Sequence, residues 1–160
     1  MKIHIAEATE QDVPVILDLI RQLAEYERLA DKVTATEDEL RRTLFGAHPA
    51  AEVLLAAVEG ETVGYALFFT TYSTFLAKPG LYLEDLFVKS HARGQGIGTA
   101  LLTRLAELAI DRGCGRLEWT VLNWNEPSIH FYDSLGAAPM RDWTLYRLTG
   151  ESLAKLASTR

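Results

Sequence analysis

The sequence predicts a single α/β (α+β) domain in which a mixed β-sheet is flanked by helices. The chain has 160 residues, which suits one domain and is short for two. Stretches with the apolar spacing of strands and of helices follow one another along the chain, with no low-complexity linker between them. Hydrophobic residues make up 48% and charged residues 24% of the chain, as expected of a globular protein with a buried core. We therefore expect one domain over residues 1–160.

In the first half of the chain, the pattern predicts two helices between strands. The tetrads Thr9–Asp12 and Thr36–Glu39 have the spacing of a capping box, and each precedes a helix. The first helix carries apolar residues at 16, 19, 20 and 23, which share one helix face. Two runs of strand-forming residues on either side of 59–61 predict a β-hairpin. The expected elements are a strand over 2–6, a helix ending near Tyr26, a helix ending near residue 45, and strands over 53–58, 62–72 and 81–88.

The second half is predicted to begin with a long helix. Leu101, Leu105 and Leu108 lie on one face of it, and Gly113 follows its end, where a helix commonly stops. Gly136 ends a second, shorter helix in the same way. The expected elements are a helix over 96–112, a strand over 117–121, a helix over 126–135, a last strand over 143–148 and a helical turn over 151–157.

Charge is unevenly distributed along the chain, whose net charge is −6. Residues 1–88 hold seven Lys/Arg and fifteen Asp/Glu, a net charge of −8, whereas residues 89–160 hold nine and seven, a net charge of +2. This acidity argues against nucleic-acid binding, which needs a basic face. The asymmetry suggests a cationic ligand for the first half and an anionic one for the second. The alternative is that solvated helix faces happen to be acidic.

The remaining composition argues against metal, disulfide and membrane chemistry. Cys114 is the only cysteine, and the four histidines show no ligand spacing, so we expect no disulfide and no metal site. No apolar stretch approaches the ~20 residues of a membrane helix, and the N-terminal residues lack the apolar block of a signal peptide. We therefore expect a cytoplasmic protein with no membrane partner.

A glycine-rich loop is the clearest chemical signal in the sequence. Gly94, Gly96 and Gly98 alternate behind Arg93, after a predicted strand and before the long predicted helix. Glycines let backbone N–H groups approach a ligand closely, and a helix N-terminus favours an anion. The spacing is neither that of the dinucleotide-binding G-x-G-x-x-G loop nor that of a P-loop. We interpret the loop as a cradle for a pyrophosphate; the alternative is a flexible turn between strand and helix.

Arg93-x-x-Gly96-x-Gly98 resembles the pyrophosphate-binding motif Gln/Arg-x-x-Gly-x-Gly/Ala of the GCN5-related N-acetyltransferase superfamily. Four more segments, which with this motif are spread over most of the chain, resemble its diamine (spermidine/spermine) N-acetyltransferase branch: Leu23–Glu27, Phe45–Pro49, Tyr82–Val88 and Trp124–Tyr132. The resemblance implies the acyl-CoA N-acyltransferase fold with a splayed sheet. It also implies acetyl-CoA as co-substrate with no metal, a small amine as acceptor, and a homodimer.

Acetyl transfer to an amine requires two proton transfers. An alkylammonium with a pKa of about 10.4 must lose a proton before it attacks the thioester, and the leaving thiolate gains from an acid. The resemblance makes Tyr132 the acid and Glu84 the anchor and base for the amine, acting through water. The alternatives are a Tyr132 packed in the core beside Phe131 and a Glu84 paired with an arginine. Asp85 follows Glu84 on the strand and points to the other face, where we expect an arginine partner for it.

The resemblance also implies which residues bind each substrate, and in strand 81–88 the backbone groups do so. The residues for the co-substrate are Leu86, Phe87, Val88, Arg93, Gly94, Gln95, Gly96, Ile97, Gly98, Thr99, Asn125, Pro127, Ser128 and Tyr132. Carboxylates and aromatic rings would attract the acceptor's ammonium, and the residues are Tyr26, Glu27, Glu84, Glu118, Trp119 and Thr120. For Glu27 and Glu118 the alternative is an exposed charge, and Asn125 and Ser128 could cap a helix.

The sequence departs from the polyamine-acetylating pattern at two positions. Ser73 and Thr74 follow Thr71-Tyr72 where that pattern has an acidic residue, and Asn123 stands where it has a glutamate. Anchors for a second ammonium are therefore fewer. Smaller diamines, thialysine-like amino acids and other primary amines remain as acceptors. The alternatives are acetylation of a peptide or protein N-terminus, and a non-catalytic acyl-CoA-binding module.

Overall fold

A computed structural model describes all residues from Met1 to Arg160. The chain divides into two compact units, residues 1–122 and residues 123–160. The expectation of one domain over residues 1–160 stays a prediction.

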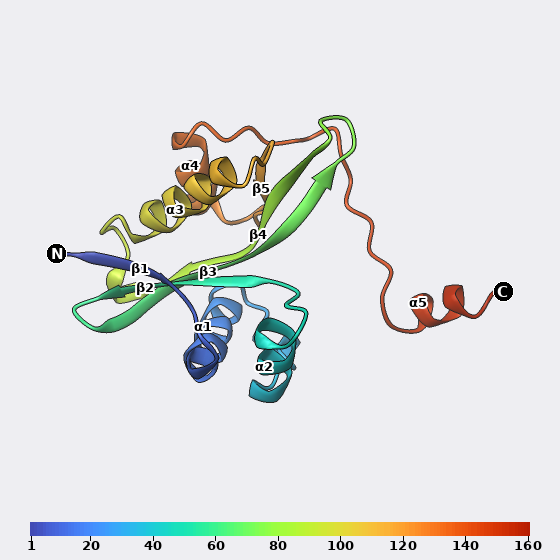
Figure 1. Cartoon of the computed structure of the whole chain (residues 1–160), viewed down its shortest axis with the longest axis horizontal. Coiled ribbons are helices and arrows are strands. Elements are labelled where there is room, and N and C mark those ends of the chain that lie inside the picture. The colour runs from blue at the N-terminus through green and yellow to red at the C-terminus, as the bar shows by residue number, and fades with distance from the viewer. The chain divides into compact units, whose positions relative to one another are not determined.

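The first unit is built on one five-stranded sheet (Figure 1). The strands lie side by side in sequence order, with bounds β1 Ile3–Glu7, β2 Glu52–Val58, β3 Glu61–Ser73, β4 Lys78–Val88 and β5 Leu117–Trp119. Neighbouring strands from β1 to β4 are antiparallel, and β4 and β5 are parallel. The predicted mixed sheet is confirmed, although β5 ends two residues earlier than expected.

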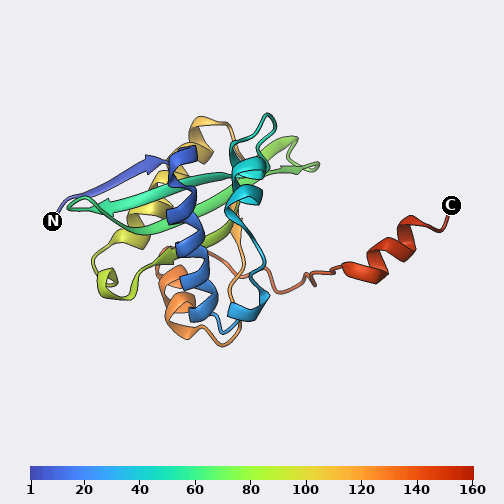
Figure 2. The same ribbon diagram turned by 90° about the horizontal axis from the view of Figure 1, so that it is seen from below.

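Helices cover both faces of this sheet (Figures 1 and 2). The helices are α1 Val13–Tyr26 and α2 Glu37–Phe45 on one face and α3 Ile97–Asp111 on the other. Short 3-10 turns lie at Glu10–Asp12, Ala30–Lys32 and Ser90–Ala92. Both predicted capping boxes form: the Thr36 hydroxyl accepts from the Glu39 N–H at 3.2 Å, and the Thr9 N–H donates to the Asp12 carboxylate at 2.7 Å.

The core of the first unit lies on both sides of the sheet. Ile16 and Leu19 of α1 and Tyr65 of β3 are fully buried, and so are Leu101 and Leu105 of α3. Burying a side chain of this size contributes roughly 1.5–3 kcal/mol. The apolar spacing of α1 and α3 therefore predicted the buried face of each helix correctly.

The centre of β4 is where this sheet opens. β4 pairs with β5 only over 81–83, and beyond that point it keeps β3 as its only partner strand. In the pairing with β3, Asp85 lies opposite Leu67 and Leu83 opposite Phe68, so Glu84 has no partner and forms a β-bulge. Backbone groups on the β5 side of 84–88 thus lack a neighbouring strand, which is the splayed geometry that the resemblance implied.

The second unit contains α4 Glu126–Ser134 and α5 Gly150–Ala157. The strand predicted over 143–148 is wrong, since this segment has neither helix nor strand, and Trp143 and Tyr146 are 77% and 91% exposed. Strand-forming residues make a strand only where a neighbour pairs with their backbone, and this unit holds no other strand.

None of the helices is both long enough and apolar enough to cross a bilayer. The cytoplasmic location stays a prediction.

Candidate active site

The glycine-rich loop runs from the end of β4 into α3 and has the geometry of an anion cradle. Gly96 is the residue before the 15-residue α3, and Gly94 and Gly96 adopt φ of +76° and +84°. Apart from the glycine itself and its two chain neighbours, no atom lies within 4 Å of where a Cβ would stand at either position. The first turn of α3 has no acidic residue. Free N–H groups at the start of a helix and open space above the glycines fit the diphosphate of acetyl-CoA.

Arg93 ties this loop to the end of α1. Its Nε donates to the Val88 carbonyl oxygen at 2.9 Å. Its guanidinium lies over the ring of Tyr26, 4.8 Å from the centroid, and over the ring of Phe87 at 5.5 Å. The loop, β4 and the last residue of α1 are therefore held together by one side chain.

Beside this contact, the end of α1 and the bulge of β4 bring together three carboxylates. Glu27 caps the C-terminus of α1 and is half-buried, Glu84 is exposed at the bulge, and Asp85 is half-buried next to it. Burial raises the pKa of Glu27, and the charges of Asp85 and Glu84 raise it further. A carboxylate at a helix C-terminus is also disfavoured by the helix dipole. The group, which we call the acidic cluster, is suited to a cationic ligand.

Asp85 has a tyrosine as its partner, where an arginine was expected. The Tyr65 hydroxyl donates to Asp85 Oδ2 at 2.8 Å. Burial, more than any other cause, raises the pKa of Asp85; the Tyr65 hydrogen bond lowers it, and the nearby Glu84 charge raises it. Burial and the Asp85 charge also raise the pKa of Tyr65 well above its usual range. Sequence reasoning missed Tyr65, because an aromatic residue in a strand is read as core; its only signal is a hydroxyl within an apolar run.

The predicted acceptor residues on β5 lie next to the point where the sheet opens. Trp119 pairs with Leu83, directly before the Glu84 bulge, and Glu118 pairs with Tyr82. Glu118 has Arg116 as a neighbour, with Nη1 at 3.9 Å from its carboxylate. Its charge is thus partly compensated. Thr120 is exposed just beyond the strand end.

Four of the predicted site residues lie in the second unit, on or before α4. Asn125 precedes the helix, and its carbonyl oxygen accepts from the Ile129 N–H at 3.0 Å. Pro127 and Ser128 stand in the first turn of the helix, where proline is well tolerated. The Tyr132 ring contacts that of Phe131, with centroids 5.6 Å apart, and both are half-buried. The roles of these four residues stay predictions.

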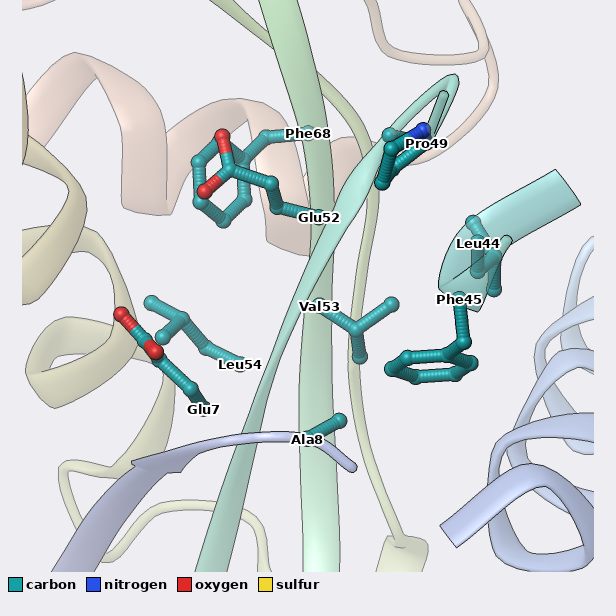
Figure 3. A pocket seen from close by; sticks show the side chains of 10 residues that line it. Glu7, Ala8, Leu44, Phe45, Pro49, Glu52, Val53, Leu54 and Phe68 are labelled. Carbon is teal, nitrogen blue, oxygen red and sulfur yellow. The ribbon is translucent and has the colours of Figure 1, made fainter. Parts of the chain in front are cut away.

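A pocket near α2 lies apart from all of these residues (Figure 3). Leu44 and Phe45 of α2 and Val53 of β2 line it, together with Glu52. The Glu52 carboxylate accepts two hydrogen bonds from Arg112, at 2.8 and 2.9 Å. Because the pocket has an apolar wall and its Glu52 is already paired, we interpret it as a gap in the packing. None of the predicted site residues lines it.

The strand β4 opens at a bulge and leads into a glycine-rich helix start, and this geometry suits an extended anionic ligand. Comparison with known proteins identifies the class: the model of the acetyltransferase (GNAT) family matches residues 16–137. The chain belongs to this family. It is an acetyl-CoA-dependent N-acetyltransferase, as the glycine motif predicted.

Several curated relatives match over most of this chain. It is 42% identical to the thialysine N-epsilon-acetyltransferase of Bos taurus, covering 97% of each chain. It is 35% identical to the L-ornithine N5-acetyltransferase of Arabidopsis thaliana, covering 91% of this chain and 84% of the relative. Spermidine/spermine N(1)-acetyltransferase-like protein 1 of Homo sapiens is 36% identical over 96% of this chain and 24% of that protein. The resemblance to the diamine acetyltransferase branch is confirmed.

A solved structure shares the fold over the whole chain. An integron cassette protein from the mobile metagenome of V. cholerae superimposes with a TM-score of 0.83 and 31% sequence identity, covering 99% of both chains. The predicted fold class is confirmed.

Proposed function

We propose that the chain transfers the acetyl group of acetyl-CoA to a primary amine of a small cationic acceptor, by direct transfer in a ternary complex. The acceptor is a diamine, a polyamine or a thialysine-like amino acid. One observation carries the proposal: beside the loop that fits a diphosphate, Glu27 has its pKa raised by burial and by the charges of Asp85 and Glu84, which lie close to it. Such a site disfavours anions and favours an ammonium group.

The acidic cluster also supplies the base that the reaction needs. Glu84 is exposed at the bulge, so water can reach its carboxylate and carry the proton from the ammonium. Acetyl-CoA supplies the acetyl group as a thioester; a C–N bond forms, the C–S bond breaks, and the sulfur takes a proton. We assign that proton to the Tyr132 hydroxyl. Backbone groups of Leu86, Phe87 and Val88, which have no strand partner on the β5 side, hold the thioester arm.

Among the acceptors, diamino acids are favoured over long polyamines. The relatives named for thialysine and ornithine are similar over nearly their whole length. Ser73 accepts a hydrogen bond from Arg116 at 2.9 Å, so a cation already occupies a position where the polyamine-acetylating pattern has an acidic residue nearby. A second ammonium therefore has fewer anchors here than the spermidine pattern provides.

The deciding experiment is a kcat/KM panel at saturating acetyl-CoA. The panel holds thialysine, ornithine, short diamines, spermidine and a peptide with a free N-terminus. We expect the diamino acids and short diamines to exceed the peptide by at least tenfold. Peptide preference would favour the N-terminal acetyltransferase alternative. No CoA release with any acceptor, despite tight CoA binding, would leave a non-catalytic acyl-CoA-binding module. Parallel rather than intersecting initial-velocity lines would exclude the ternary complex.

The role of Tyr132 is tested by Tyr132→Phe. Loss of a general acid lowers kcat by about 100-fold, while the Kd of CoA, measured by calorimetry, stays unchanged. Tyr82→Phe is the matched control, since Tyr82 is also a half-buried tyrosine whose ring contacts a phenylalanine. An unchanged kcat in Tyr132→Phe would remove this residue from the acid role.

We further propose a homodimer, as the resemblance implies. The support is the exposure of large apolar side chains in 143–148, of which Trp143 and Leu145 are each 77% exposed. Patches of this kind mark interaction surfaces. Sedimentation equilibrium should give twice the mass of the 17.8 kDa chain, and Trp143→Ser should lower that mass; a monomer at micromolar concentration would contradict the proposal.

A further inference from the structure

Tyr65 is a fully buried side chain whose polar end is not explained by packing. Its ring lies in the core between the sheet and α1, with Ile16, Leu19 and Phe87 in the same cluster. A phenylalanine would fill the same space, and a buried hydroxyl costs free energy unless it is hydrogen bonded. The one hydrogen bond that this hydroxyl makes is to Asp85. The Tyr65 hydroxyl therefore serves to hydrogen-bond the Asp85 carboxylate.

The β-bulge is what brings the two groups together. Tyr65 lies opposite Phe87, and Leu67 lies opposite Asp85, so Tyr65 and Asp85 are diagonal neighbours on the sheet. A diagonal neighbour is within reach of an aromatic side chain. Because Glu84 is an extra residue, it shifts the alternation of side chains between the two faces of β4. Asp85 therefore lies on the same face as Phe87, and Leu83 lies on the opposite face. The bulge thereby places Asp85 towards α1 and leaves Glu84 beside it.

Charged groups surround this pair from three elements. Glu27 approaches from the end of α1, Glu84 from β4, and Arg93 from the loop, where its guanidinium lies on Phe87. Burial raises the pKa of Asp85, and the Tyr65 hydrogen bond opposes this shift. The Asp85 charge in turn raises the pKa of Glu27, after burial. The hydroxyl therefore favours the charged form of Asp85, the carboxylate beside Glu27 and Glu84.

We propose that Tyr65 is a positioning residue for acetyl transfer: its hydroxyl holds Asp85 as a fixed, charged neighbour of Glu27 and Glu84 and so sets the affinity for the acceptor's ammonium. This inference rests on the proposed acceptor site. It assigns Tyr65 an effect on the acceptor and none on acetyl-CoA. The effect grows as the pH falls, because Asp85 without its hydrogen bond takes up a proton at higher pH.

The test is the pH profile of kcat/KM for the best acceptor, from about pH 6 to about pH 9, in Tyr65→Phe. We expect its acidic limb to move to higher pH by about one unit, the size expected from losing a hydrogen bond to a charged group. At neutral pH the KM of the acceptor should rise several-fold, with kcat at saturation and the Kd of CoA unchanged. Tyr82→Phe is the matched control, because Tyr82 is a half-buried tyrosine of β4 whose ring contacts Phe69.

A second replacement keeps the test decisive if Tyr65→Phe folds poorly. Tyr65→3-fluorotyrosine keeps the shape and strengthens the donor, so the acidic limb should move the other way, to lower pH. In Asp85→Asn the acceptor KM should rise, and adding Tyr65→Phe should change nothing further. If both Tyr65 replacements leave the limb in place in an active enzyme, or if kcat and both affinities fall together, Tyr65 is only structural. A wild-type enzyme that acetylates no amine would instead overturn the proposed function.

Discussion

The glycine-rich loop and the acidic cluster are adjacent sites of opposite charge built in opposite ways. The loop is made of backbone: Gly94 and Gly96 at positive φ, and the N–H groups at the start of α3. The cluster is made of side chains from the end of α1 and the bulge of β4. Arg93 joins them, with its guanidinium on Tyr26, the residue before Glu27.

Because the two sites are built differently, we expect substitutions to disrupt them in different ways. A backbone site depends on local conformation, so it is lost when one residue can no longer adopt its φ. A side-chain site depends on several charges at once, so each substitution weakens it in part. Perturbing one site should leave the other intact, except where Arg93 is changed.

The largest effect is expected at Gly96→Val. A β-branched residue is strained at φ +84°, and a Cβ there meets no protein atom, so the change acts on the loop's backbone and on the ligand's space. We expect the Kd of CoA, measured by calorimetry, to rise about 100-fold, the loss of roughly two charge-assisted hydrogen bonds. Gly60→Val, at φ +82° in the β2–β3 turn with equally open space, is the matched control for strain. Equal CoA binding in both variants would place the diphosphate elsewhere.

The next effect separates the cluster from the loop. Glu27→Gln removes one of the three carboxylates, so the KM of the acceptor should rise about tenfold, while the Kd of CoA stays as it was. Glu25→Gln is the control, since Glu25 lies on the last turn of α1 and is exposed. Loss of CoA affinity in Glu27→Gln would mean that the two sites are not separate.

The same contrast explains what the sequence could predict. The loop follows from spacing alone, because glycines and a helix start are local features, and both capping boxes and the apolar faces of α1 and α3 are local as well. The Tyr65–Asp85 pair depends on a bulge that shifts β4 relative to β3. No local sequence pattern indicates which residue of a strand forms such a bulge. For the same reason the arginine expected beside Asp85 was the wrong partner, and the strand expected over 143–148, which needs a neighbour, is absent.

A smaller effect should reach both sites at once. Arg93→Lys keeps the charge but loses the planar group that lies on Tyr26 and Phe87. Lysine replaces neither the stacking nor the Nε donor geometry. We expect the Kd of CoA and the KM of the acceptor each to rise about threefold, in proportion to the ~0.5–1 kcal/mol of an exposed cation–π contact. A change in only one of them would show that Arg93 belongs to that site alone.

The smallest effect concerns stability and has a definite sign. The pKa of Asp85 is raised in the folded chain, first by burial, so the stability that its neutral form provides is present at acidic pH and is lost as the pH rises through the raised pKa. In Asp85→Asn this loss of stability disappears, because the side chain carries no charge. The amide oxygen still accepts the Tyr65 hydrogen bond. Thermal unfolding at pH 7.5 should therefore show a Tm about 3 °C above wild type, the scale of a 1 kcal/mol change in a chain of this length. The difference should shrink at acidic pH, where Asp85 takes up a proton. A lower Tm at both pH values would show that the Asp85 carboxylate stabilises the fold through Tyr65. The expected higher Tm, together with a higher KM for the acceptor, would show that the charge of Asp85 serves acceptor binding and lowers stability.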